Sequence, residues 1–454
     1  MVGIMKILVC VKVIKGEINP FDESALECAL QLSDDVTVLS MGPKSCADVL
    51  KPLTRLGAKV VLISDSIFAG SDTLATSYIL STAIKQMEYD LIVCGRQSID
   101  GDTAQVGPMI SQMLETTRIT NVLKIQINEN KVLADTRMGE ECAELPALIT
   151  VERGYVLRFP SIFSKVSDVE IIDNTKLECD VSKCGLTGSP TKVLKTFENE
   201  RGKRKCKFIL MEDLFPLIDE LMHQNETEVQ QEYIGKKLNS VWAVGEEVLQ
   251  KAGEISEQVI LIEKMSPEKI AQKAIEEKPD VILWNSDLWG RKNAPIVAAM
   301  LKTGLCADCT QVETDGENLI MYRPAQGGNI TAKIKCDTKP QMATVRTKTK
   351  SSDIVVSGGK GVSDKLEKLE ELAKVLNAET GASRGLVDMN KVPYDKQIGL
   401  TGKNISPKIY IAIGISGAIQ HTCAIEGCAK VIAINPDKNA RIFEYADFGI
   451  IEMF

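Results

Sequence analysis

Short apolar segments alternate with helical patterns through the first part of the chain, and this order leaves few folds open. Segments rich in Val, Ile and Leu occupy residues 5–13, 36–40, 59–63 and 90–94. Helical patterns lie between them, at 22–32, 45–55 and 72–87. Buried parallel strands appear as continuous apolar runs, and helices connect one such strand to the next. The sequence therefore predicts an α/β protein with parallel sheets.

The same order returns in the middle of the chain, so the sequence contains an internal repeat. A helix at 103–115 and extended segments at 119–127, 131–138 and 145–151 complete the first copy. Three landmarks recur in the same order in both copies. Asp90-Leu-Ile-Val-Cys94 matches Asp280-Val-Ile-Leu-Trp284, and Pro108 and Leu114 match Pro295 and Leu301. Residues 146–151 match residues 340–345. In the second copy we expect strands at 239–244, 258–262 and 280–284, and helices at 245–252, 266–277 and 291–302. The copies should form two pseudo-symmetric nucleotide-binding-type domains.

Changes in composition divide the chain further. Residues 224–232 are polar with few apolar anchors, which is typical of a linker. A third α/β unit begins after the polar residues 348–353, and its first helix carries a stripe of leucines. We expect a first domain with a C-terminal arm at 1–223, a linker at 224–237, a second domain at 238–350 and a third at 351–454.

Charge, hydropathy and cysteine usage exclude several classes of protein. The net charge of −8 does not suit a nucleic-acid binder. No apolar run approaches the roughly 20 residues that span a membrane, and no export signal is recognisable. The thirteen cysteines are therefore expected to be reduced thiols in a cytoplasmic protein. We expect no metal site, because Cys306-x-x-Cys309 lacks a second pair and only His223 and His421 could supplement it.

The third unit carries glycine and polar clusters where its strands should end. These are Gly381-Ala-Ser-Arg384, Gly399-Leu-Thr-Gly-Lys403, Gly414-Ile-Ser-Gly-Ala-Ile-Gln-His421 and Ala433-Ile-Asn435. Ligands of α/β sheets bind beyond the carboxyl ends of the strands, and bare glycine amides can approach a phosphate closely. Taken alone, the glycine pattern fits either a ligand loop or an ordinary tight turn.

Together these motifs resemble the FAD-binding domain of the electron-transfer flavoprotein alpha subunit. Trp289-Gly-Arg291, residues 303–310 and residues 323–329 resemble the first domain of that subunit. Residues 1–200 resemble the beta subunit, through Cys10-Val-Lys12, Asn19-Pro-Phe-Asp22, Asp100-Gly-Asp-Thr-Ala-Gln-Val-Gly-Pro108 and Gly188-Ser-Pro190. The resemblance covers nearly the whole chain and implies the two subunits fused, beta first.

The resemblance implies FAD in the third domain and assigns residues to it. His421 would donate to the flavin N1–O2 edge, Arg384 would lie over the isoalloxazine, and Thr401 would reach N5. The remaining contacts would come from Ser383, Gln397, Ile398, Gly399, Gly402, Lys403, Ser416, Gly417, Ala418, Gln420 and Asn435. Leu400 stands where the family usually has Gln, and we expect the usual C-terminal helix of the alpha subunit, with one adenosine-side contact, to be absent after residue 454.

The first copy of the repeat suggests a second nucleotide. Gly101-Asp-Thr-Ala-Gln-Val-Gly107 precedes its helix, and small residues with a hydroxyl at a helix N-terminus suit a phosphate. A simple helix capped by Thr103 is the alternative. The expected lining is Cys10, Lys12, Ser98, Asp102, Thr103, Ala104, Gln105 and Val106. The second copy has only Gly290-Arg-Lys-Asn-Ala294 there, so we expect no nucleotide in it.

Family members hold AMP or a second FAD at this position, and the Gly-Asp-Thr-Ala-Gln-Val-Gly-Pro form is more similar to members with two FADs. The favoured interpretation is electron bifurcation, from NADH to ferredoxin or flavodoxin and to the third-domain flavin. A carrier with one FAD and one AMP is the first alternative. A nucleotide-sensing module without redox chemistry and a self-contained NADH oxidoreductase are the others. No nucleophile–base arrangement for a bond-breaking enzyme is recognisable.

A partner surface is also implied. In the family, a beta-subunit loop inserts an apolar anchor into an acyl-CoA dehydrogenase or a related flavoprotein dehydrogenase. The matching stretch is 157–163, in which we expect Ile162 to be the anchor, with Phe163 as the alternative. Both residues could instead be core residues beneath the loop.

Overall fold

The computed structural model describes residues 4–198, 204–223, 237–325, 330–347, 351–399 and 402–454. They fall into two compact units. The first unit contains the chain up to residue 196 together with 237–325 and 332–345, and the second contains 204–223 with 351–454. The domain bounds expected from the sequence remain a prediction.

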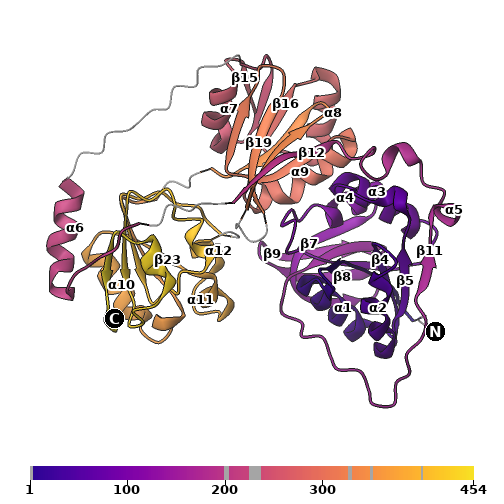
Figure 1. Cartoon of the computed structure of the whole chain (residues 1–454), viewed down its shortest axis with the longest axis horizontal. Helices are drawn as coiled ribbons and strands as arrows, with labels where there is room; N and C mark the ends of the chain where they lie inside the picture. The colour runs from indigo at the N-terminus through magenta and orange to yellow at the C-terminus, as the bar shows by residue number, and fades with distance from the viewer. Residues whose placement is uncertain (1–3, 199–203, 224–236, 326–329, 348–350, 400–401) are drawn as a thin grey trace. The chain divides into compact units, whose positions relative to one another are not determined.

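A nine-stranded sheet forms the centre of the first copy of the repeat (Figure 1). Its parallel part is β11(Glu170–Ile172), β5(Lys59–Ile63), β4(Asp35–Met41), β1(Lys6–Val11), β6(Leu91–Gly95) and β10(Ala147–Val151). The sheet continues through β7(Thr117–Asn128), β8(Lys131–Thr136) and β9(Gly139–Glu144), where β7, β8 and β9 pair antiparallel. The predicted parallel α/β sheet is thus confirmed.

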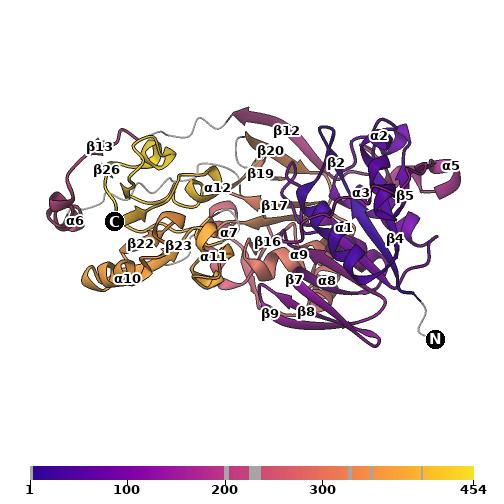
Figure 2. The ribbon, with the colours of Figure 1, turned by 90° about the horizontal axis from the view of Figure 1, so that it is seen from below.

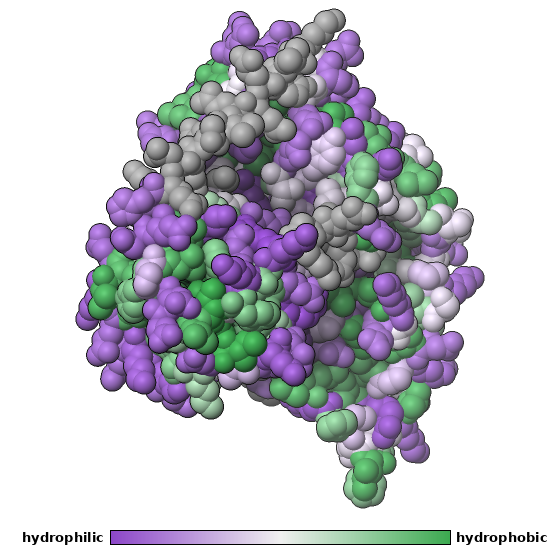
Figure 3. All heavy atoms as spheres, turned by 60° about the vertical axis from the view of Figure 1, so that its left-hand side comes forward, coloured by the Kyte–Doolittle hydropathy of each residue, from purple (hydrophilic) through white to green (hydrophobic). Residues whose placement is uncertain are grey.

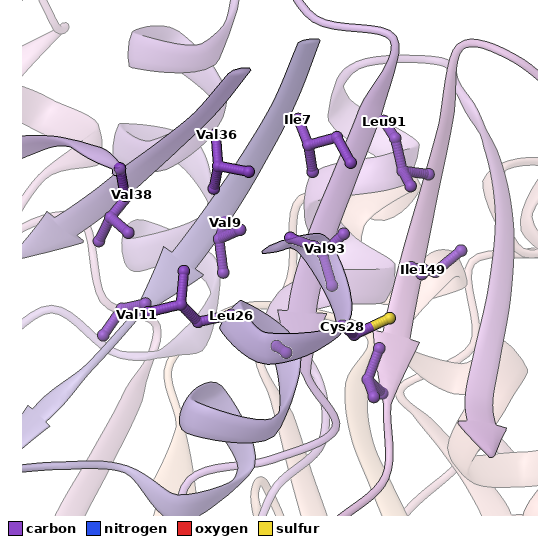
Figure 4. Packing of buried hydrophobic residues seen from close by; sticks show 14 of the residues in the cluster. Ile7, Val9, Val11, Leu26, Cys28, Val36, Val38, Leu91, Val93 and Ile149 are labelled. Carbon is purple, nitrogen blue, oxygen red and sulfur yellow. The ribbon is translucent and has the colours of Figure 1, made fainter. Parts of the chain in front are cut away.

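Helices cover both faces of this sheet, which explains the continuous apolar strands. α1(Pro20–Leu32) and α2(Cys46–Leu50) pack on Ile7, Val9 and Val93, as Figure 4 shows for part of this core. α3(Thr73–Ile84) and α4(Val106–Met113) pack on the opposite face. Each fully buried Val, Ile or Leu stabilises the fold by roughly 1.5–3 kcal/mol. The expected helix at 45–55 ends early, and a 3-10 turn, Lys51–Leu56, follows it, because Pro52 has no amide hydrogen for an α-helical bond.

The second copy builds a five-stranded parallel sheet in the order β15(Val259–Ile262), β14(Val241–Val244), β16(Val281–Asn285), β21(Gln341–Val345) and β17(Leu305–Cys309). Its helices are α7(Leu249–Ile255), α8(Pro267–Glu277) and α9(Leu288–Leu301). A separate four-stranded sheet contains β12(Thr191–Glu198), β20(Ile330–Cys336), β19(Leu319–Ala325) and β18(Gln311–Thr314).

Equivalent hydrogen bonds in the two copies confirm the repeat. The amide of Ala147 donates to Asp90, and the amide of Gln341 donates to Asp280. The amides of Asn121 and Asp308 each donate to the threonine hydroxyl of the neighbouring strand, at 3.0 and 2.7 Å. Strands β6 and β16 begin one residue after the matched aspartates, as the sequence alignment requires.

The second unit is a six-stranded parallel sheet in the order β13(Lys207–Phe208), β26(Phe448–Ile450), β25(Lys430–Ile434), β24(Ile409–Ile413), β22(Ile354–Gly358) and β23(Glu379–Ala382). Figure 2 shows β13 beside β26 at its edge. Its helices are α10(Leu366–Val375), α11(Arg384–Asp388), α12(Ile419–Thr422) and α6(Leu214–His223). Leu214, Ile218 and Leu221 of α6 belong to the core beneath this sheet.

Arg204 holds the arm that contains β13 and α6. Its guanidinium pairs with Asp447 and donates to the carbonyl oxygen of Cys428 at 2.6 Å. The arm therefore completes the second unit, although it follows the first domain in the sequence. None of the helices in the described ranges is long and apolar enough to cross a membrane.

Candidate functional site

The third-domain motifs converge where the parallel strands of the second unit end. Ser383 and Arg384 follow β23, the turn 414–418 follows β24, and Asn435 follows β25. Gln397 bridges to Ala382, which brings the loop that begins at 397 to the same edge. The structure thus brings together, at the carboxyl edge of one sheet, the segments that carry the described FAD residues expected from the sequence.

The turn after β24 suits a phosphate group. Gly417 has φ +82°, and a Cβ there would lie 2.1 Å from the backbone nitrogen of Ile442, so only glycine fits. Among the described residues, the amides of Ser416, Gly417 and Ala418 make no hydrogen bond to another backbone group. Ser416 and Ala418 are exposed. The turn therefore offers free donors and room for close approach, which are the requirements of an FAD pyrophosphate.

Asn435 shapes this turn. Its Nδ2 donates to the carbonyl oxygen of Ile415 at 2.9 Å, and its Oδ1 accepts from the amide of Asp437 at 2.9 Å. The side chain is buried. Asn435 is therefore placed to support the turn, and both of its bonds are made within the protein.

His421 is buried between two protein groups. Its Nδ1 lies 3.0 Å from the carbonyl oxygen of Ile398, and its Nε2 lies 2.7 Å from the hydroxyl of Tyr410. A carbonyl can only accept, so Nδ1 carries the proton and Nε2 accepts from the tyrosine. Burial lowers the pKa of His421 to about 4, so the ring is neutral near pH 7. A bond from His421 to a flavin would have to replace one of these two.

The remaining third-domain residues take varied positions. Arg384 pairs with Asp388 of its own helix at 3.1 Å, and Lys403 lies 3.5 Å from Glu379. Gln397 and Ile398 are buried, whereas Gln420 is exposed. Gly402 leaves space for the carbonyl of Gln397, 2.2 Å from where a Cβ would lie. Thr401, like Leu400, lies outside the described residues.

The first domain contains a cavity of about 850 Å³ at the carboxyl ends of its strands. Seven of the eight residues expected from the sequence line it: Cys10, Lys12, Ser98, Thr103, Ala104, Gln105 and Val106. Asp102 is not among the lining residues, and its carboxylate accepts from Gln97 Nε2 at 2.9 Å. A cavity of this size lies toward the upper end of the roughly 300–1,000 Å³ typical of ligand sites.

The loop 101–105 forms one wall of this cavity and is held from the second copy. Gln105 Nε2 donates to the carbonyl oxygen of Leu305 at 3.0 Å, and its Oε1 accepts from Thr73 at 2.7 Å. The buried guanidinium of Arg323 donates to the carbonyl oxygen of Gly101. The alternative of a helix capped by Thr103 is wrong, because α4 begins at Val106 and its N-cap position is Gln105.

A buried carboxyl group also lines the cavity. Asp22 accepts from the amide of Lys12 at 2.7 Å and lines the cavity. Burial raises the pKa of Asp22 to about 7, against the opposing effect of this hydrogen bond. Lys12 itself pairs with Asp100 at 2.7 Å, at the rim. Asp65 and Asp72 also line the cavity, as do Lys44 and Arg96, so its lining carries charges of both signs.

Two further segments that line the first-domain cavity were not predicted from the sequence. The loop after β4, from Met41 to Lys44, and the segment from Ser64 to Asp72 after β5 both line the cavity. Both follow parallel strands that were recognised in the sequence. The rule that ligands bind beyond strand ends would have found them if it had been applied to every strand of the sheet.

The second copy differs at the equivalent place. α9 begins at Leu288, and the carboxylate of Asp287 accepts from the amide of Gly290 at 2.7 Å. A Cβ on Gly290 would lie 1.9 Å from the carbonyl oxygen of Asn285. A carboxylate therefore occupies the helix N-terminus that a phosphate would need, in line with the expectation of no nucleotide there.

The loop between β10 and β11 exposes five large apolar side chains, of which Val166 is 51% exposed. Val156, Phe159, Ile162 and Phe163 are 86–96% exposed. The loop projects from the first domain in Figure 1, and the lower tip in Figure 3 carries apolar surface. The alternative that Ile162 and Phe163 are core residues is therefore wrong.

Comparison with known proteins identifies the family. The pattern described as electron transfer flavoprotein domain matches residues 7–162 and 266–367, and the electron transfer flavoprotein FAD-binding domain matches 348–426. The electron transfer flavoprotein subunit alpha of Thermoanaerobacterium thermosaccharolyticum is 40% identical over 229 residues, which cover 40% of this chain and 69% of that protein. Subunit beta of the same organism is 41% identical over 195 residues, 39% of this chain and 75% of that protein.

Protein FixB of Clostridium saccharobutylicum is 38% identical over 229 residues, which cover 40% of this chain and 69% of FixB. The matches to subunit alpha and subunit beta fall on different parts of the chain. The chain therefore belongs to the electron transfer flavoprotein family, as an FAD-binding electron-transport protein in which beta-like residues precede alpha-like residues in one polypeptide.

Proposed function

We propose that this protein carries out electron bifurcation with two FAD molecules, one in the third domain and one in the first-domain cavity. The cavity of about 850 Å³ is the observation that carries the proposal, because its volume suits a dinucleotide better than a mononucleotide. Bound there, a flavin supplies the exchange of one electron pair from NADH for two single electrons, one for ferredoxin or flavodoxin and one for the third-domain FAD.

In this proposal, residues in and around the cavity bind the phosphates of the second FAD or position the loop that does so. The backbone amides of Thr103 and Ala104 and the N-terminus of α4 face the phosphates, and Arg323 keeps the loop 101–105 in place. Asp22, with its pKa near 7, is uncharged in part of its population and so repels a phosphate less than an ordinary carboxylate. Asp287 keeps nucleotide out of the second copy.

Extraction of the cofactors tests the proposal. Two FAD and no AMP per chain are expected, and one FAD with one AMP would instead establish the single-flavin carrier. Thr103→Glu places a negative charge beside the expected phosphates and should remove one FAD per chain. Thr196→Glu, an exposed threonine on β12 that does not line the cavity, is the matched control and should retain both.

The exposed loop between β10 and β11 suggests the partner protein, and the free thiols suggest the cellular compartment. We propose that Ile162 docks on an acyl-CoA dehydrogenase or a related flavoprotein dehydrogenase, through an apolar contact at the centre of the interface. We place the protein in the cytoplasm, since all thirteen cysteines are free thiols.

A further inference from the structure

Two cysteines lie side by side in the wall of the first-domain cavity. Cys10 of β1 and Cys94 of β6 are direct partners in the parallel register. Both side chains belong to the core cluster on the α3 and α4 side of the sheet, so they point to the same face. Both line the cavity, and both are free thiols.

The register places the Cα atoms of the two cysteines at a separation that a disulfide can join. Neighbouring strands lie about 4.8 Å apart, and disulfides join Cα atoms separated by roughly 4.4–6.8 Å. The neighbouring Cys10 thiol and burial both raise the pKa of Cys94. They are only 9% and 5% exposed, so the cavity is the route by which a small reagent can reach them.

We propose that Cys10 and Cys94 form a redox-active dithiol, which a peroxide oxidises to a disulfide when the first-domain cavity is empty and which bound nucleotide shields. The shielding rests on the proposed function of the cavity as a nucleotide site. The oxidation rests only on the register and on the position of the two thiols.

The chemistry balances with the peroxide as the oxidant. The Cys10 sulfur attacks one peroxide oxygen and becomes a sulfenic acid, and the other oxygen leaves as water. The Cys94 sulfur then displaces the sulfenic hydroxyl, which leaves as a second water, and the disulfide forms. Two thiols and one hydrogen peroxide thus give one disulfide and two waters. Because the raised pKa makes Cys94 the weaker nucleophile, Cys10 is assigned the first attack.

A second cysteine pair provides an internal control. Cys306 and Cys309 also interact, and they are 2% and 0% exposed. Neither lines the first-domain cavity. Cys142 is exposed and reports that the reagent is active. Peroxide that enters through the cavity should therefore spare the Cys306–Cys309 pair.

The experiment compares the full chain, depleted of nucleotide, with the same protein loaded with AMP or with FAD. Each sample is treated with hydrogen peroxide and mapped by peptide mass spectrometry. We expect a Cys10–Cys94 disulfide in depleted protein, formed at least tenfold more slowly in loaded protein. In Cys94→Ser, oxidation should stop at a Cys10 sulfenic acid that dimedone traps. Cys10→Ser should give no adduct at Cys94.

Three results would overturn the inference: no Cys10–Cys94 disulfide in depleted protein, equal rates with nucleotide bound, or oxidation of Cys306–Cys309 at the same rate, which would indicate general opening. Equilibrium dialysis of the same samples measures AMP and FAD binding. If neither binds at the cavity, the proposed function and the shielding both fail, whereas disulfide formation still decides the dithiol itself.

Discussion

Burial fixes the protonation state of His421. Its pKa in the folded chain is about 4, below the value of roughly 6.5 for an unfolded histidine. Between these values the unfolded chain binds a proton that the folded chain does not. The stability contributed by neutral His421 is therefore present above pH 6.5 and is lost as the pH falls toward 4.

We predict that this loss reaches about 3 kcal/mol at pH 4. His421→Gln has no titrating ring, so its free energy of unfolding should fall less than that of the wild type between pH 6.5 and 4. Urea unfolding of both proteins at several pH values measures the difference. If the free energies of unfolding of the two proteins changed equally with pH, the assignment of a neutral, buried ring would be contradicted.

The same residue is expected to tune the flavin. Replacing His421 by Ala removes the donor to Ile398 and any donor to the flavin N1–O2 edge, so the midpoint potential should become more negative while FAD remains bound. His223→Ala is the matched control, because that ring is exposed on α6. Spectroscopic redox titration measures the midpoint potentials. Unchanged potentials in His421→Ala would show that His421 does not tune the flavin.

At the scale of elements, the loop between β10 and β11 carries the clearest prediction. Ile162 is 86% exposed, and burying such an anchor at the centre of an interface can supply about 2 kcal/mol, or roughly a thirtyfold change in affinity. Ile162→Ala should weaken the functional interaction with an acyl-CoA dehydrogenase by this factor and leave the flavin spectrum unchanged.

Leu186→Ala is the control for this loop, since Leu186 is 74% exposed elsewhere in the first unit. Electron transfer is followed as a function of dehydrogenase concentration. Equal half-saturation concentrations for Ile162→Ala and the wild type would place the anchor on another residue or point to a different partner, and Phe163→Ala would be the next variant to measure.

At the scale of the whole molecule, the two compact units have separate cores. We predict that nucleotide in the first-domain cavity stabilises the first unit alone. A ligand at a hundredfold excess over its Kd adds about 2.7 kcal/mol. Calorimetry of nucleotide-depleted protein with added AMP, which is expected only in the first-domain cavity, should shift one of two unfolding transitions. A common shift of both would show that the units unfold together.

Much of this organisation was predictable from local sequence. The buried strands appear as continuous runs of Val, Ile and Leu because helices cover both faces of their sheets, and the repeat was recognisable because β6 and β16 keep the same start and length. Family motifs located the loop 101–105 and the segments around Ser383, Ser416 and Asn435. The start of α4 was misjudged because residues 102 and 104 adopt positive φ, which periodicity does not report.

The sequence by itself determined the α/β class, the internal repeat and the residues that gather at strand ends, because side-chain periodicity and turn chemistry act over a few residues. Only the tertiary structure decided what those residues touch. The bond of Gln105 to Leu305, the packing of the arm on the third-domain sheet, and the neighbours of His421 and Cys10 all join distant segments. Burial and register create these contacts, and both depend on how the whole chain packs.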